Sequence, residues 1–206
     1  MKIRCKCLIL LLSIATTFGA DKDEGFRPGP AESFEHRQSV SGLTVAADAY
    51  STKEETKQAF DKLDPNRYGV LPVLVVMQND SGEALRLDEM RVSYVRADGR
   101  TYGAVPADEV RYLRGAERPR GIPQPRTSPI PRSPIPGLGG GNNNNPLDAW
   151  EIEGRRFAAE MLPPGDNAYG FFYFDVLLTR GAILYLTGIR EASTGQELFF
   201  MEIPLE

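Results

Sequence analysis

The sequence has few residues suited to thiol or metal chemistry. Its two cysteines, Cys5 and Cys7, both lie within the first twenty residues, and His36 is the only histidine. Past residue 20 the chain therefore has no disulfide, thiol nucleophile or thiolate metal site. One histidine also excludes a site with several histidine ligands or a relay between two histidines. We expect no catalytic residue, no metal and no cofactor, and interpret the protein as a non-enzyme.

The first twenty residues have the pattern of an export signal. Lys2, Arg4 and Lys6 precede an apolar run over residues 8–18, and the chain becomes polar from Asp21. This run is much shorter than the roughly twenty apolar residues of a membrane-spanning helix. We therefore expect residues 1–20 to be a cleaved signal peptide, with no stable membrane insertion afterwards. The mature protein is predicted to be periplasmic or extracellular.

The balance of charge is acidic overall and basic in one segment. The leader carries three basic and no acidic residues, so its removal changes the net charge from −4 to −7. An acidic chain is a poor nucleic-acid binder, because phosphate backbones require a basic face. From Arg111 to Arg132, however, six arginines accompany one acid, Glu117.

Residues 21–40 are predicted to be a flexible linker, because they combine Pro28-Gly29-Pro30 with many charges and lack apolar periodicity. His36 lies in this linker and is expected to be solvated. The spacing of Asp21, Asp23 and Glu32 is similar to a calcium loop, but glycine occupies the fifth ligand position. We therefore predict no calcium site.

Residues 41–206 have the pattern of one β-rich domain. Alternation over 43–49 predicts a half-buried strand, and the valine-rich run over 70–77 predicts a strand buried on both faces. Further strands are predicted at 85–87, 91–96, 101–102, 168–175, 182–189 and 198–205, with an Asp98-Gly99 hairpin turn. In the last strand, Phe199, Met201, Ile203 and Leu205 share the predicted apolar face.

Helices are predicted at three places. A capping box at Ser51–Glu54 precedes an apolar face of Thr56, Ala59, Phe60 and Leu63, and a short helix is predicted over 107–113. A third helix is predicted from Asn145-Pro146 to residue 162, with Leu147, Trp150, Gly154, Phe157 and Met161 on one face. Short strands without βαβ alternation then predict an all-β, immunoglobulin-like antiparallel sandwich with two or three peripheral helices.

The aromatic residues from Tyr169 to Phe174 have two interpretations. They form either a central strand in the core, which we favour, or the lining of a ligand groove. Asn79-Asp80-Ser81 also matches a glycosylation acceptor. Two acidic pairs, Asp108/Glu109 and Glu151/Glu153, are expected to be solvated rather than catalytic.

Residues 114–146 are predicted to be a long disordered Pro/Gly/Asn loop inserted in the domain. They contain a proline-rich repeat, three consecutive glycines and four consecutive asparagines. The loop is either a solvated insertion or a docking segment. In the second case, the candidate partner-binding residues are Arg118, Arg120, Arg126 and Arg132.

Four segments carry a resemblance to a known group of proteins. Residues 74–82, 98–102, 162–165 and 170–174 resemble uncharacterised exported bacterial proteins with an immunoglobulin-like β-sandwich. The resemblance implies a non-enzymatic accessory role and assigns no functional residue. We therefore expect an exported, non-catalytic binding or structural module of the cell envelope, whose partner is an envelope protein or an anionic polymer. The alternative is an inhibitor or modulator of an extracytoplasmic enzyme that acts through residues 114–146.

Overall fold

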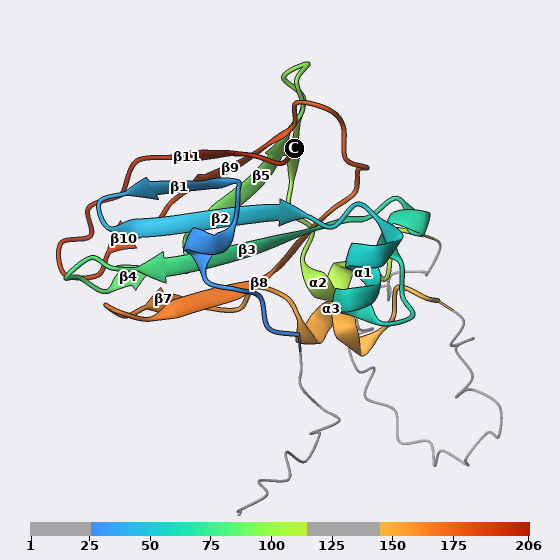
Figure 1. The fold of residues 1–206 in the computed structure, drawn as a ribbon, viewed down its shortest axis with the longest axis horizontal. Helices are drawn as coiled ribbons and strands as arrows, with labels where there is room; N and C mark the ends of the chain where they lie inside the picture. Colours follow the sequence, from blue (N-terminus) through green and yellow to red (C-terminus); the bar gives the residue numbers. More distant parts are fainter. Residues whose placement is uncertain (1–25, 115–144) are drawn as a thin grey trace, which may run out of the picture.

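Three antiparallel sheets form the scaffold in the computed structural model, which describes residues 26–114 and 145–206 (Figure 1). The predicted signal peptide, most of the predicted loop and all four candidate arginines lie outside these residues. The described chain is mostly β-structure with few helices, which confirms the all-β class.

The strands fall into two four-stranded sheets and one small sheet. The first sheet has the order β1 (Arg37–Val40), β2 (Leu43–Ala49), β3 (Leu71–Asn79) and β8 (Asn167–Phe174). The second has the order β11 (Met201–Pro204), β9 (Ile183–Thr187), β5 (Arg91–Val95) and β6 (Thr101–Gly103). The small sheet has the order β10 (Arg190–Glu191), β4 (Leu85–Arg86) and β7 (Met161–Leu162).

The helices gather at one end of the first sheet (Figure 1). They are α1 (Lys53–Phe60), α2 (Ala107–Val110) and α3 (Trp150–Gly154), with the 3-10 turn η2 (Pro65–Tyr68). The other 3-10 turn, η1 (Ala31–Ser33), lies against β2 and β3. All are short, and their stability comes from the apolar side chains that they bury rather than from helix propensity.

The first sheet separates two hydrophobic cores. One face packs against the second sheet through residues such as Val45, Val75 and Leu184. The other face packs against the helices through Phe60 and Phe171, among others. Because both faces are covered, β2 is buried almost throughout and is not the half-buried strand that its alternation predicts. The prediction for β3, buried on both faces, is confirmed.

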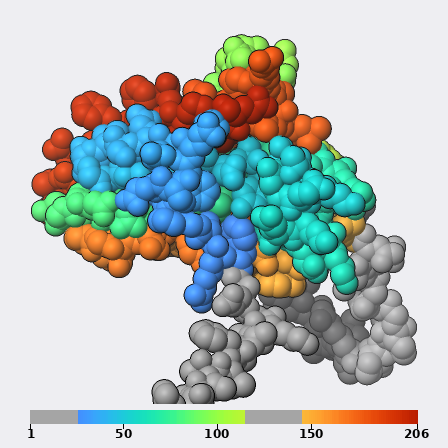
Figure 2. Space-filling view, in the orientation of Figure 1, coloured from blue at the N-terminus to red at the C-terminus, as the bar shows by residue number. Residues whose placement is uncertain are grey.

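The prediction of a flexible linker is wrong for its described part, residues 26–40. Residues 37–40 form β1, which pairs with β2, and the His36 carbonyl accepts a hydrogen bond from the Ala47 amide at 3.1 Å. Phe26 packs 5.4 Å from the ring of Phe171 in the second core. In the space-filling view, the blue residues at the start of the described chain lie over the sheet beside α1 (Figure 2). Contacts made far along the chain thus order a segment without periodicity of its own.

All three predicted helices have different limits, and α2 ends at Val110 rather than at residue 113. The capping box at α1 is formed by Thr52 and Glu55, one residue later than predicted. The third helix ends at Gly154, because the following residues pair with β8: the Phe171 amide donates to the Arg155 carbonyl at 2.8 Å. Gly170 permits this close approach, since a Cβ there would lie 2.4 Å from the Cα of Phe157.

Most of the aromatic run in β8 belongs to the cores, whereas Tyr169 at its start is 42% exposed and lines a hollow. Phe171 and Tyr173 are buried in the second core, and Phe174 is buried in the first. At the last strand the prediction is wrong for Phe199, which is 79% exposed, whereas Met201 and Ile203 are fully buried. Phe199 precedes β11 and does not follow its alternation.

Candidate functional site

Residues 115–144, which we call the arginine-rich segment, are flanked by residues held at the helical end of the molecule. Before it, Arg114 forms an ion pair with Asp175 at 2.9 Å. After it, the side-chain amide of Asn145 donates to the carbonyl of Arg111 at 2.6 Å and accepts from the amide of Leu147 at 3.1 Å. Residues 115–144 therefore leave and rejoin the fold at one end, although their own positions are outside the described residues.

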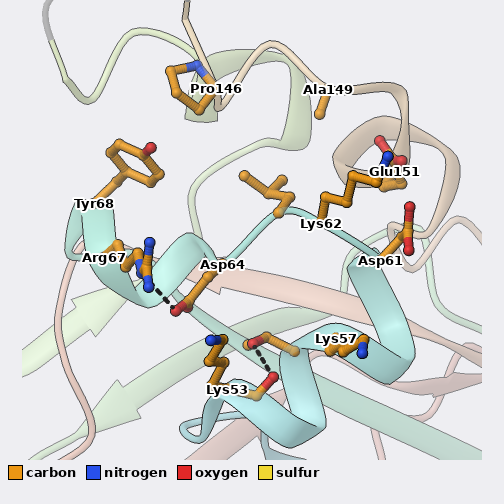
Figure 3. Close-up of a pocket in the computed structure, with 12 residues that line it drawn as sticks. Lys53, Lys57, Asp61, Lys62, Asp64, Arg67, Tyr68, Pro146, Ala149 and Glu151 are labelled. Atoms are coloured by element: carbon orange, nitrogen blue, oxygen red, sulfur yellow. Dashed lines mark hydrogen bonds and ion pairs between the residues drawn. The ribbon is translucent and has the colours of Figure 1, made fainter.

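A hollow in the described part lies at this same end (Figure 3). It is an open cleft of about 760 Å³ between α1, η2 and the chain around Pro146. We call it the cationic cleft. Its basic residues are Lys53, Lys57, Lys62 and Arg67, and its acidic residues are Asp61, Asp64 and Glu151.

Local helix geometry places the basic residues of the cleft. Lys53 and Lys57 are four residues apart in α1, so they lie on one side of the helix. Ala59 and Phe60 occupy the opposite, buried side and hold α1 against the sheet. The positive φ of Asp61, 54°, ends the helix and turns the chain toward Lys62.

The cleft has a small excess of positive charge, with four basic and three acidic side chains. Arg67 pairs with Asp64 at 3.4 Å, which leaves three lysines facing Asp61 and Glu151. Among the described residues, none forms an ion pair with these lysines. One carboxylate oxygen of Asp64, Oδ1, is buried without a hydrogen-bond partner in the described structure. The cleft thus offers several exposed cations close to the two ends of the arginine-rich segment.

The other candidate groups do not converge on a reactive centre. Burial raises the pKa of Asp48, with a smaller contribution from Glu55, and raises the pKa of Tyr50 to about 12. Of the acidic pair in α3, Glu153 bonds to Arg111, while Glu151 lines the cleft. Within residues 26–114 and 145–206, no group of three metal-ligating side chains is found.

Asn79 has a structural position rather than that of an exposed glycosylation acceptor. Its side chain is fully buried. Its amide donates to the carbonyls of Glu83, Leu162 and Pro163, and its oxygen accepts from Ser81. The amide nitrogen is therefore engaged in the folded protein.

Sequence reasoning missed the cleft, although the spacing of its lysines was a usable signal. Lys53 and Lys57 at i and i+4, opposite an apolar stripe, mark a cationic helix face. The approach of Pro146 and Glu151 from almost a hundred residues later could not be predicted from such a local pattern. No helix in the described part of the chain is long and apolar enough to cross a membrane.

Comparisons with known proteins give only distant likenesses. No family model matches the chain, and no curated protein matches it. The X-ray structure of a Northeast Structural Genomics Consortium target, SoR45, is 12% identical with a TM-score of 0.34, covering 80% of this chain and 85% of that chain. MPT63, a secreted protein of Mycobacterium tuberculosis, is also 12% identical with a TM-score of 0.34, covering 84% of this chain and 95% of its own.

Proposed function

We propose that the protein is an exported, non-catalytic binding module of the cell envelope. An immunoglobulin-like sandwich serves as its scaffold, and its helical end binds an anionic polymer. The observation that carries this proposal is the position of the arginine-rich segment, whose two ends are held beside the cationic cleft.

Charge is distributed in a way that suits this function. Residues 115–144 contain four arginines and one glutamate, whereas the chain without its leader has a net charge of −7. The remaining surface is therefore acidic and repels a polyanion, so the polymer is directed to the helical end. Single exposed ion pairs contribute only about 0–1 kcal/mol, so useful affinity requires many contacts along a polymer.

The site also distinguishes a polymer from a small anion. The cleft is open, and the ammonium groups of its lysines lie at the ends of long, exposed side chains. This arrangement suits the successive charges of a polymer rather than one enclosed anion. Such binding should weaken steeply with added salt, because exposed charges are screened over about 8–10 Å at physiological ionic strength.

Binding of the exported protein to long-chain polyphosphate and to polygalacturonate tests the proposal. The triple variant Lys53→Gln, Lys57→Gln and Lys62→Gln should lose about tenfold in affinity at low salt. A matched control removes the same charge at exposed arginines away from the cleft: Arg91→Gln, Arg100→Gln and Arg180→Gln. The control should lose clearly less, and equal losses in both variants would contradict a site at the cleft.

A second variant tests the segment itself. Replacing Arg118, Arg120, Arg126 and Arg132 with glutamine should weaken polyanion binding further at low salt. If polyanions do not bind while an envelope enzyme is retained from an extract through residues 114–146, the alternative function as an inhibitor or modulator replaces this proposal.

A further inference from the structure

We propose that the free edge of β8 and the hollow beside it bind an extended peptide segment of a partner protein, with an acidic side chain, by strand addition. This inference does not depend on the proposed function, because the site shares no residue with the cationic cleft. The hollow, called the edge pocket, has a volume of about 190 Å³. It is lined by Phe26, Trp150, Gly154, Arg155, Arg156, Tyr169 and Gly170.

The first half of β8 has an unpaired edge. β8 is the last strand of the first sheet, and its outward main-chain groups at Phe171 pair with Arg155 and Phe157. Tyr169 lies two residues earlier, so its main-chain N–H and C=O point to the same side. No residue in the described structure bonds to these groups, nor to those of Asn167. An unpaired strand edge is a template for another extended chain.

The edge pocket supplies side-chain contacts next to this edge. Trp150 is 70% exposed and Tyr169 is 42% exposed, an unusual position for such large rings. The guanidinium of Arg155 lies 5.7 Å from the centre of the Phe26 ring and 5.8 Å from that of Trp150. This cation–π stack holds the indole at the surface, where an apolar side chain of a ligand can pack on it.

The charge of the pocket predicts an acidic residue in the peptide. Arg155 and Arg156 line the pocket, and its lining contains no acid. The Nη1 atom of Arg155 is buried and has no hydrogen-bond partner in the described structure. A carboxylate that displaces the Trp150 ring slightly would accept this unused hydrogen bond, which is stronger than a neutral one.

Strand geometry favours a peptide over a sugar chain. The odd-numbered side chains of β8, such as Tyr169 and Phe171, point to the helix-covered face where the pocket opens. In an added strand every second side chain would point to the same face, which places alternate residues over Trp150 and Arg155. Main-chain groups of the peptide would meanwhile pair with Tyr169 and Asn167.

Trp150 is the only tryptophan of the chain, so its emission reports on this pocket alone. The probe is an acetylated and amidated peptide of alternating valine and threonine with one central glutamate. Titrating it into the exported protein should give a saturable change in Trp150 emission. Versions with lysine for glutamate, or with N-methylated amides on the pairing side, should bind at least about tenfold more weakly.

Two protein variants separate the main-chain contacts from the side-chain contacts. Tyr169→Pro removes the outward N–H, whereas Tyr169→Ala keeps it, so the proline variant should lose about tenfold more affinity than the alanine variant. Arg155→Gln should weaken the glutamate peptide but not a version with glutamine at that position. Circular dichroism and thermal midpoints check folding, and the N-methylated peptide decides the question if Tyr169→Pro does not fold.

Two results would overturn the inference that the edge of β8 binds a peptide. Unchanged Trp150 emission at millimolar peptide would do so, as would equal binding of the methylated and unmethylated peptides. A response to polygalacturonate with none to the peptide would assign the pocket to an acidic sugar instead.

Discussion

Replacing Asn79 with alanine should destabilise the fold more than its small change in volume suggests. The amide group of Asn79 bonds to the carbonyls of Glu83 at 2.8 Å, Leu162 at 2.9 Å and Pro163 at 3.1 Å. Glu83 lies in the turn after β3, Leu162 is the last residue of β7, and Pro163 begins the turn between β7 and β8. One side chain therefore joins segments more than eighty residues apart.

The size of the loss in unfolding free energy depends on which of these carbonyls water can reach in the variant. The bond to Leu162 is buried, and a buried acceptor left without a partner costs about 1–3 kcal/mol. The contacts to Glu83 and Pro163 are partly buried, so water replaces Asn79 there. Because the amide nitrogen has only two hydrogens, these two contacts together count as one further hydrogen bond, whose loss costs about 0.5–1.5 kcal/mol. Together these give roughly 1.5–4.5 kcal/mol for Asn79→Ala, before any additional loss at Ser81.

Urea titration followed by far-UV circular dichroism measures this loss. The control is Gln78→Ala, because the half-buried Gln78 side chain donates to exposed Asp80 at 3.2 Å and makes no other hydrogen bond within the described residues. The control should change the free energy of unfolding by less than about 1 kcal/mol with the same denaturant slope. A loss below about 1 kcal/mol for Asn79→Ala would refute the idea that these carbonyls depend on it.

Four further outcomes are expected. Phe171→Ala should cost about 3–5 kcal/mol in the same titration, whereas Phe199→Ala, at a position 79% exposed, should stay within about 0.5 kcal/mol. The pKa of Tyr50 is raised from 10.0 to about 12, so its contribution to stability is complete below pH 10 and is lost as the pH rises to about 12. Tyr50→Phe should flatten the decline in urea midpoint over this range. A chelator should leave the thermal midpoint unchanged, and replacing residues 117–144 with a short Gly/Ser linker should preserve the fold, because closure entropy changes slowly with loop length.

Local patterns were sufficient where one segment determines its own structure. The valine-rich run of β3 and the Asp98-Gly99 turn were predicted within a few residues. The capping box moved by one residue because Ser51 and Thr52 each have a glutamate three positions later, and only packing selects between them.

Long-range contacts determine the elements that the sequence pattern does not predict or predicts wrongly. β1 has little apolar pattern and exists because β2 offers it a partner. The apolar pattern predicts that the third helix continues through Phe157. In the structure, Arg155 and Phe157 form main-chain hydrogen bonds with β8, and these end the helix. The edge pocket likewise combines Phe26, Arg155 and Tyr169, which no sequence window contains together.

The place of Phe26 in the second core has a kinetic consequence. Its ring contacts Phe171, and further along the chain the Glu202 amide donates to the Gln38 side chain, 164 residues away, at 2.8 Å. The first described residues thus complete their contacts only when the final strands are available. Such a topology has a high contact order and folds slowly. The contacts of β1 with β11 therefore form only after the last strand has been synthesised.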